Sequence, residues 1–336
     1  MKLVQGFQQI LQETKYDTIA CDIYGVIHDG IRAYPHSKSA LTELKEHLVL
    51  LSNSTRLQDK LDSHMTTKFD IRNTQYNSIL SSGTLTKLFL QDVVECKQTT
   101  IKPACHATVQ HNGQARRMEP QEFAEQYLKT GKFFLSGDRD WQEPLYSHLP
   151  LLERQDSWEE IDFVLLGSVR GVFPETDPVD PFDEAKVQAN YQPLLDGCLK
   201  RQVPMICANP DVFAPNGLNP DGSTKLLICP GYIGQMYEKM GGQVLYFGKP
   251  FESIYNYLVA HRSNESGKII CVGDNVATDV RGATEAGLDV VMILGGVHWE
   301  ELKDAKDDQE LMDRVKELCR QNKTKEPTYL MPLLKY

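Results

Sequence analysis

Both ends of the chain alternate short apolar runs with stretches of helical periodicity, and this alternation restricts the fold more than any other feature. Near the start, residues 18–21 and 48–51 are apolar runs, and residues 38–47 and 57–67 have helical character. Strand–helix–strand units of this length predict a parallel, doubly wound α/β sheet. Ligands of such sheets bind beyond the carboxyl ends of the strands.

The same alternation returns late in the chain, between an apolar run at 244–247 and another at 290–294. Between these two halves lies a long segment, residues 93–231, with apolar runs of its own at 132–135 and 163–166. We therefore expect a second α/β domain at 93–231, inserted into a first domain that is formed by the flanking residues. The flanking parts of the first domain are residues 1–92 and 232–336.

Composition excludes some classes of protein. The 336 residues include 46 acidic and 36 basic side chains, which gives a net charge of −10. A nucleic-acid-binding protein needs a basic surface, so we expect no nucleic-acid partner. No run approaches the ~20 apolar residues of a membrane span, and we expect no membrane partner. The eight cysteines form no CxxC pair and the N-terminus is not a signal peptide, so a cytoplasmic location is predicted.

Polar residues follow four of the apolar runs, in segments 22–26, 51–54, 248–250 and 273–279. A doubly wound sheet brings the ends of its strands to one edge, so we expect these segments to meet there. The side chains in these segments that could react with a ligand or bind it are Asp22, Ser52, Asn53, Lys249, Asp274 and Asp279.

In order and character, the four segments resemble the four motifs of the haloacid dehalogenase superfamily. Residues 22–30 are similar to the first motif of the branch that carries a large cap between motifs two and three, which includes nucleotidases and p-nitrophenylphosphate phosphatases. Residues 208–211, Ala-Asn-Pro-Asp, resemble another segment of that branch, and the likeness extends from about residue 17 to residue 296. The resemblance implies a Rossmann-like core with an inserted α/β cap.

The resemblance also implies a nucleophile and a metal. Asp22 would attack phosphorus and form an aspartyl-phosphate. Mg²⁺ prefers oxygen ligands, and Asp22, the backbone carbonyl of Tyr24 and Asp274 would hold it. Asp279 would be a further metal ligand or would lie just behind the ligands, although a position on a helix surface is an alternative for this residue.

Five residues would contact the substrate, a small phosphorylated molecule. Lys249 would neutralise the phosphoryl oxygens, and the Ser52 hydroxyl would donate a hydrogen bond to one of them, with Asn53 beside it. Ser52 and Asn53 could instead cap the following helix. Asn209 and Asp211 are candidates for substrate contact, and a turn or hinge is the alternative role for that segment.

The sequence departs from the phosphatase pattern at Tyr24. Phosphatases of the superfamily have aspartate here, which protonates the leaving group and then activates water. A phenol with an ordinary pKa of ~10 is a poor base at neutral pH, and acid–base help is worth roughly 10²–10⁴-fold. We expect a slow phosphatase. The alternatives are a binding module that keeps Mg²⁺ and phosphate, or a dehalogenase, which also has tyrosine here but lacks the acidic pair of Asp274 and Asp279.

Overall fold

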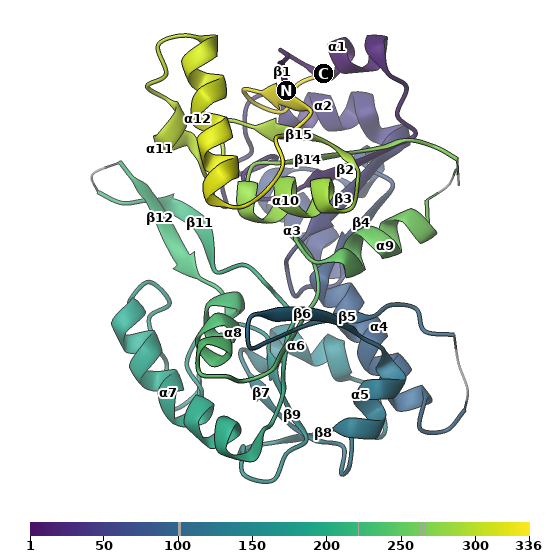
Figure 1. Cartoon of the computed structure of the whole chain (residues 1–336), viewed down its shortest axis with the longest axis vertical. Helices are drawn as coiled ribbons and strands as arrows, with labels where there is room; N and C mark the ends of the chain where they lie inside the picture. Colours follow the sequence, from purple (N-terminus) through teal and green to yellow (C-terminus); the bar gives the residue numbers. More distant parts are fainter. Residues whose placement is uncertain (100–101, 221, 263, 265) are drawn as a thin grey trace.

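The chain forms two lobes, shown in Figure 1 as an upper lobe that contains both termini and a lower lobe. The computed structural model describes residues 1–336 except 100, 101, 221, 263 and 265. Each lobe is built around one seven-stranded sheet. The predicted class, an α/β protein with a second α/β unit inserted into the first, is confirmed.

The sheet of the upper lobe is parallel at every pair of neighbouring strands. Its strands, in spatial order, are β1 (Lys2–Leu3), β16 (Tyr329–Met331), β15 (Asp289–Ile293), β14 (Ile269–Gly273), β2 (Thr18–Asp22), β3 (Leu48–Ser52) and β4 (Ser78–Ser81). From β2 the chain continues outward on one side through β3 and β4, whereas β14 is followed by β15 and β16 on the other side. The order therefore reverses between β2 and β14, where ligands bind in such sheets.

Helices cover both faces of this sheet, as the continuous apolar runs predict. All five residues of β2 are buried, and so are all five of β14. Ile19 and Cys21 of β2 pack with helices on one face, and Ala20 belongs to the core of the other face. The helices of the first face are α1 (Phe7–Glu13), α2 (Ser37–Leu44) with the 3₁₀ turn Lys45–His47, and α3 (Gln58–Phe69), and the short turn Asn73–Gln75 follows α3. Helices of the other face are α9 (Glu252–Ala260), the π-helical turn η3 (Val276–Val280) with α10 (Arg281–Glu285), α11 (Trp299–Leu302) and α12 (Asp308–Gln321).

The lower lobe has a mixed sheet in which only the pairs made by β5 are antiparallel. Its strands, in spatial order, are β6 (Gln114–Met118), β5 (Ala107–His111), β13 (Val244–Tyr246), β10 (Met205–Cys207), β9 (Phe163–Leu166), β7 (Lys132–Ser136) and β8 (Glu153–Gln155). The sequence placed run 244–247 in the first domain, but the structure pairs β13 with β10 and β5. That placement was wrong because a fully buried strand has the same apolar pattern in either sheet.

The helices of the lower lobe also extend beyond residues 93–231. They are α4 (Ser82–Glu95), α5 (Pro120–Gln126), α6 (Arg139–Tyr146), α7 (Glu184–Arg201) and α8 (Pro230–Lys239). Helix α4 packs on α5 and α6, and α8 packs on the sheet of this lobe. We therefore propose that the chain crosses between the lobes near residues 81–82 and 247–248. Among the helices of the described residues, none is long and apolar enough to cross a membrane.

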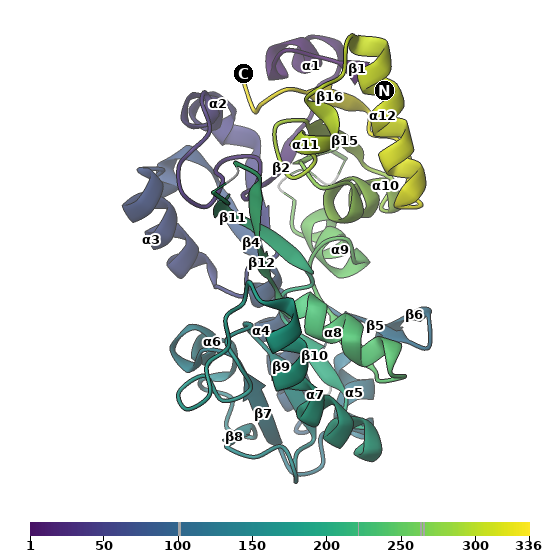
Figure 2. The same cartoon turned by 90° about the vertical axis from the view of Figure 1, so that its left-hand side faces the viewer.

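A two-stranded hairpin, β11 (Phe213–Leu218) and β12 (Thr224–Ile228), projects from the lower lobe toward the upper one (Figure 2). Strand β11 of this hairpin faces the loop that follows β2. A Cβ atom added to Gly30 would lie 3.5 Å from the carbonyl oxygen of Pro215, and one added to Gly217 would lie 3.6 Å from the Ile31 side chain. The lower lobe thus covers the side of the upper sheet at which β2 ends.

Candidate active site

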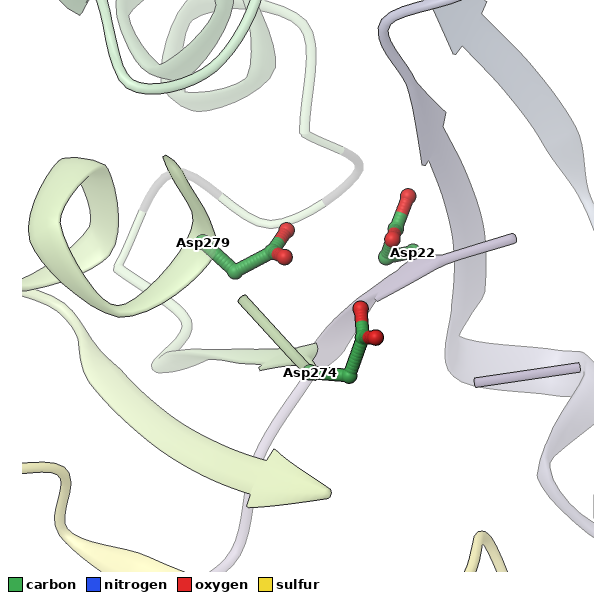
Figure 3. A group of neighbouring side chains, drawn as sticks. All are labelled: Asp22, Asp274 and Asp279. Carbon is green, nitrogen blue, oxygen red and sulfur yellow. The ribbon is translucent and has the colours of Figure 1, made fainter. Parts of the chain in front are cut away.

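Three buried aspartates gather at the carboxyl ends of β2 and β14, where the strand order reverses. Asp22 is the last residue of β2, Asp274 follows β14 directly, and Asp279 belongs to the π-helical turn Val276–Val280. One carboxylate oxygen from each lies within 4.8 Å of the other two. Figure 3 shows the three carboxylates directed toward a common space. Asp279 is 2% exposed, so a position on a helix surface is excluded.

Lys249 is the cation within this acidic group. Its Nζ lies 2.5 Å from Asp22 Oδ1 and 2.8 Å from Asp279 Oδ1, and its side chain is 4% exposed. Burial by itself would lower the pKa of Lys249, but the two carboxylates raise it well above its ordinary value. The lysine is therefore charged at neutral pH and neutralises only part of the negative charge that surrounds it.

The carboxylate of Asp274 is in close contact with the backbone at two glycines, where any side chain would collide with it. Gly25 has φ +79°, and a Cβ atom on it would lie 1.9 Å from Asp274 Oδ2, while one on Gly296 would lie 2.2 Å away. The Val297 amide donates a hydrogen bond of 2.6 Å to the same oxygen. Burial, and then repulsion by Asp279, raise the pKa of Asp274 to about 7.

The donor set fits a small, hard divalent cation. Burial and the neighbouring carboxylates also raise the pKa of Asp22 well above its ordinary value, although Lys249 opposes this shift. Clustered carboxylates with raised pKa values indicate that the site has more negative charge than its own lysine balances. Mg²⁺ takes oxygen ligands of this kind, and it would be held by Asp22 and Asp274 with Asp279 beside them.

Ser52 and Asn53 lie at the end of β3, next to Asp22 in the sheet. Both are buried, and α3 begins only at Gln58 with Leu57 as its N-cap, so neither residue caps that helix. Asn53 Oδ1 accepts a hydrogen bond of 2.8 Å from the Lys249 amide, and Asn53 Nδ2 donates one of 2.9 Å to the Lys249 carbonyl. Asn53 thus fixes the backbone of Lys249 rather than presenting both of its polar atoms to a substrate.

Asn209 and Asp211 come from the lower lobe, directly after β10. Asp211 Oδ1 accepts a hydrogen bond of 2.8 Å from Asn53 Nδ2, so the cap segment reaches the core site. Asn209 Oδ1 accepts a hydrogen bond of 2.9 Å from the Asp211 amide, which forms a turn. The structure therefore places Asp211 at the site, while the side chain of Asn209 holds the turn that positions it.

Tyr24 lies on the loop that follows β2. Its ring packs edge-on against His28 with the ring centres 4.5 Å apart, and His28 stacks on Phe69. The side chain is 39% exposed, and burial of its inner part raises the pKa of the phenol above 10. The hydroxyl is thus even less able to act as a base at neutral pH than a free tyrosine.

Two parts of the site were not predicted from the sequence. They are the Val297 amide and the close approach of Gly296, which together hold Asp274. The consecutive glycines 295 and 296 after the apolar run at 290–294 are a signal that such an approach occurs, because glycine is favoured where backbone meets a functional group.

Fold and site together define a class: a doubly wound α/β protein with an aspartate at the end of a central strand, a buried lysine beside it and two more aspartates from the adjacent strand end. Sequence comparison agrees with this class. Residues 19–113 match the family model described as haloacid dehalogenase-like hydrolase, and residues 246–318 match one described as HAD-hydrolase-like. The chain belongs to the haloacid dehalogenase-like hydrolases.

Solved structures share the fold along the whole chain. A haloacid dehalogenase-like hydrolase from Brucella suis 1330 is 24% identical with a TM-score of 0.66, and the similarity covers 99% of this chain and 100% of that one. A possible sugar phosphatase from Cytophaga hutchinsonii is 19% identical with a TM-score of 0.65, covering 99% and 98%.

A curated relative matches over a shorter stretch. Dihydroxyacetone phosphatase from Corynebacterium glutamicum (strain R) is 34% identical over 99 residues. The match spans 27% of this chain and 32% of that protein.

Proposed function

We propose that the protein is a Mg²⁺-dependent phosphatase that acts on a small phosphorylated metabolite through an aspartyl-phosphate on Asp22. The observation that carries this proposal is the position of Asp22, which lies 2.5 Å from Lys249 among three clustered carboxylates at the switch point of the sheet. The names of two similar proteins, a dihydroxyacetone phosphatase and a possible sugar phosphatase, support a phosphorylated sugar or triose as the substrate class. The cytoplasmic location stays a prediction.

In this function a carboxylate oxygen of Asp22 attacks phosphorus, and the displacement is divided into two easier steps. The charged Lys249 neutralises the phosphoryl oxygens as charge develops on them, and the Ser52 hydroxyl donates a hydrogen bond to one of them. Asp22, the Tyr24 carbonyl and Asp274, with Asp279 alongside, would hold Mg²⁺, which would supply the positive charge that lets an anionic nucleophile approach an anionic substrate.

Tyr24 does not supply the proton that esters with a poor leaving group need, so their hydrolysis is slow unless another side chain donates it. Its phenol has a pKa above the ordinary value, so it does not give or take a proton readily at neutral pH. Substrates that release a stable anion, such as acyl phosphates and p-nitrophenyl phosphate, do not need that proton. We therefore expect them to be hydrolysed faster than alkyl phosphates.

Mg²⁺ should stabilise the fold, and more strongly at pH 8 than at pH 6. The pKa of Asp274 is about 7 in the metal-free protein, against about 4 in an unfolded chain. Because the pKa is raised on folding, the contribution of this group to stability is fully present below pH 4 and is lost as the pH rises through about 7. Mg²⁺ at 100 times its Kd should raise the free energy of unfolding by about 2.7 kcal/mol. At pH 6 the ion competes with the Asp274 proton and the gain is smaller.

Urea unfolding at both pH values, with and without Mg²⁺, measures this effect. Asp274→Asn should remove the Mg²⁺-dependent gain, whereas Asp156→Asn, at a side chain that is 90% exposed in the lower lobe, should retain it. An equal gain in Asp274→Asn would contradict the assignment of this residue to the metal.

Phosphate release from a panel of alkyl, aryl and acyl phosphates, measured with Mg²⁺ and with EDTA, tests the function. Mg²⁺-dependent release supports a phosphatase. The clustered carboxylates of the site also allow a second function, a module that binds Mg²⁺ and phosphate without turnover, and binding without release from any substrate would favour it. Chloride release from a haloacid without Mg²⁺ would instead indicate a dehalogenase.

A further inference from the structure

Asp211 is an acidic side chain that the lower lobe contributes to a site built otherwise on the upper sheet. Its Oδ1 accepts a hydrogen bond of 2.8 Å from Asn53 Nδ2, and the same amide nitrogen donates to the Lys249 carbonyl. Lys249 in turn contacts Asp22 through Nζ. Asp211 is thus linked to the nucleophile through two side chains, although it comes from the other lobe.

The backbone of Asp211 is fixed on both sides. Its amide donates to Asn209 Oδ1, and its carbonyl accepts a hydrogen bond of 3.0 Å from Gly231 at the start of α8. A Cβ atom on Gly231 would lie 2.2 Å from the Pro210 carbonyl oxygen and 2.6 Å from that of Asp211. The carboxyl group is therefore held at a defined place, as a proton-transfer group must be.

One oxygen of this carboxyl group remains available. Oδ1 is occupied by Asn53, whereas Oδ2 has no hydrogen-bond donor among the residues that the structure describes. Attack by Asp22 requires the leaving oxygen to lie roughly opposite, across the phosphorus atom. Because Asp22 ends a strand of the upper sheet, the leaving oxygen points away from that strand and toward the lower lobe, which contributes Asp211.

The surroundings of Asp211 suit proton transfer near neutral pH. Burial raises the pKa of Asp211 to about 6, while Asn53 and Lys249 oppose the rise and Asp279 adds to it. The thiols of Cys207 and Cys229 are the other titratable groups beside it, and burial raises the pKa of both. Tyr24, by contrast, has a phenol with a pKa above 10.

We propose that Asp211 is the catalytic acid and base of this protein. It takes the role of the aspartate that related phosphatases have at the position of Tyr24. The inference rests on the proposed phosphatase function. In the first step the bond from Asp22 to phosphorus forms, the ester P–O bond breaks, and the Asp211 proton goes to the leaving oxygen. In the second step water adds to phosphorus, its proton goes to Asp211, and the bond from phosphorus to Asp22 breaks. The sum is ester plus water giving alcohol plus phosphate.

Asp211→Asn separates proton transfer from binding, because asparagine retains an oxygen that can accept from Asn53. For an alkyl phosphate such as glycerol phosphate, kcat should fall by about 10²-fold or more, the range of acid–base catalysis. For p-nitrophenyl phosphate the leaving anion needs no proton, so the rate of Asp22 phosphorylation, followed in a single turnover, should change less than about fivefold by the same argument. The KM values should change little for either ester.

A second variant tests the same idea by rescue. Tyr24→Asp in the Asp211→Asn background restores a carboxyl group at the family position, and alkyl phosphatase activity should recover by at least about tenfold. Retained thermal unfolding shows that both variants fold. An equal loss for both esters in Asp211→Asn, or no recovery in the double variant, would overturn the proposal. If the wild-type protein releases no phosphate from any ester, it is the phosphatase function itself that fails.

Discussion

Asp22→Asn should abolish phosphate release, with kcat falling by roughly 10⁴–10⁶-fold, the range seen when a covalent nucleophile is removed. Asparagine retains an oxygen that can accept the Lys249 hydrogen bond, so the lysine keeps its place. What is lost is the anionic oxygen that attacks phosphorus, and no other described carboxylate occupies the end of β2. Stopped assays of inorganic phosphate, with Mg²⁺ and p-nitrophenyl phosphate, measure the change.

Mass spectrometry adds a readout of the intermediate itself. Wild-type protein quenched in acid during turnover should carry one phosphoryl group on Asp22, and Asp22→Asn should carry none. Asp70→Asn, at an exposed carboxylate 3.4 Å from Lys38, serves as the control and should retain wild-type turnover. Residual release above one per cent of wild type in Asp22→Asn would mean that another group attacks phosphorus.

Lys249→Met should destabilise the metal-free protein by about 3–5 kcal/mol at pH 8, the cost of leaving buried charges without their partner. The side chain contacts Asp22 and Asp279, which are both nearly inaccessible to solvent, and Asp274 lies in the same group. Without the lysine these carboxylates repel one another in a medium that screens charge poorly. Methionine fills much of the same volume, so the effect reports charge rather than a cavity. Urea unfolding in EDTA measures it.

The pH dependence of this cost gives the sharpest check. Burial and mutual repulsion already raise the pKa values of Asp22 and Asp274, so lowering the pH protonates these groups and removes the repulsion. The deficit of Lys249→Met should therefore shrink between pH 8 and pH 5, and Mg²⁺ should reduce it at pH 8. Lys303→Met, on the surface beside Glu300, should change stability by no more than about 0.5 kcal/mol. A deficit equal at both pH values would exclude the electrostatic explanation.

Local sequence determined the strands of the upper sheet and the residues at their ends. The apolar runs at 18–21 and 48–51, and the run that precedes segment 273–279, correspond to β2, β3 and β14, because a strand covered on both faces must be apolar throughout. Once these runs are parallel neighbours, their carboxyl ends lie at one edge of the sheet. The expectation that Asp22, Ser52 and Asp274 lie together at that edge therefore follows from the sequence alone. The same argument cannot assign a run to one of two sheets, which is why residues 244–247 were placed in the wrong lobe.

Tertiary structure alone decided how the site is assembled from distant segments. Asn53 and Asp211 are 158 positions apart, and Lys249 and Asp22 are 227 apart, so no periodicity or spacing relates them. Two further hydrogen bonds, from the Val297 amide to Asp274 and from the Asp211 amide to Asn209, likewise depend on the conformation of loops. Periodicity reports which face of an element is buried, whereas these contacts arise only when two sheets and their connecting loops pack together. The sequence thus determined the reactive groups, and the packing of the two lobes determined which of them touch.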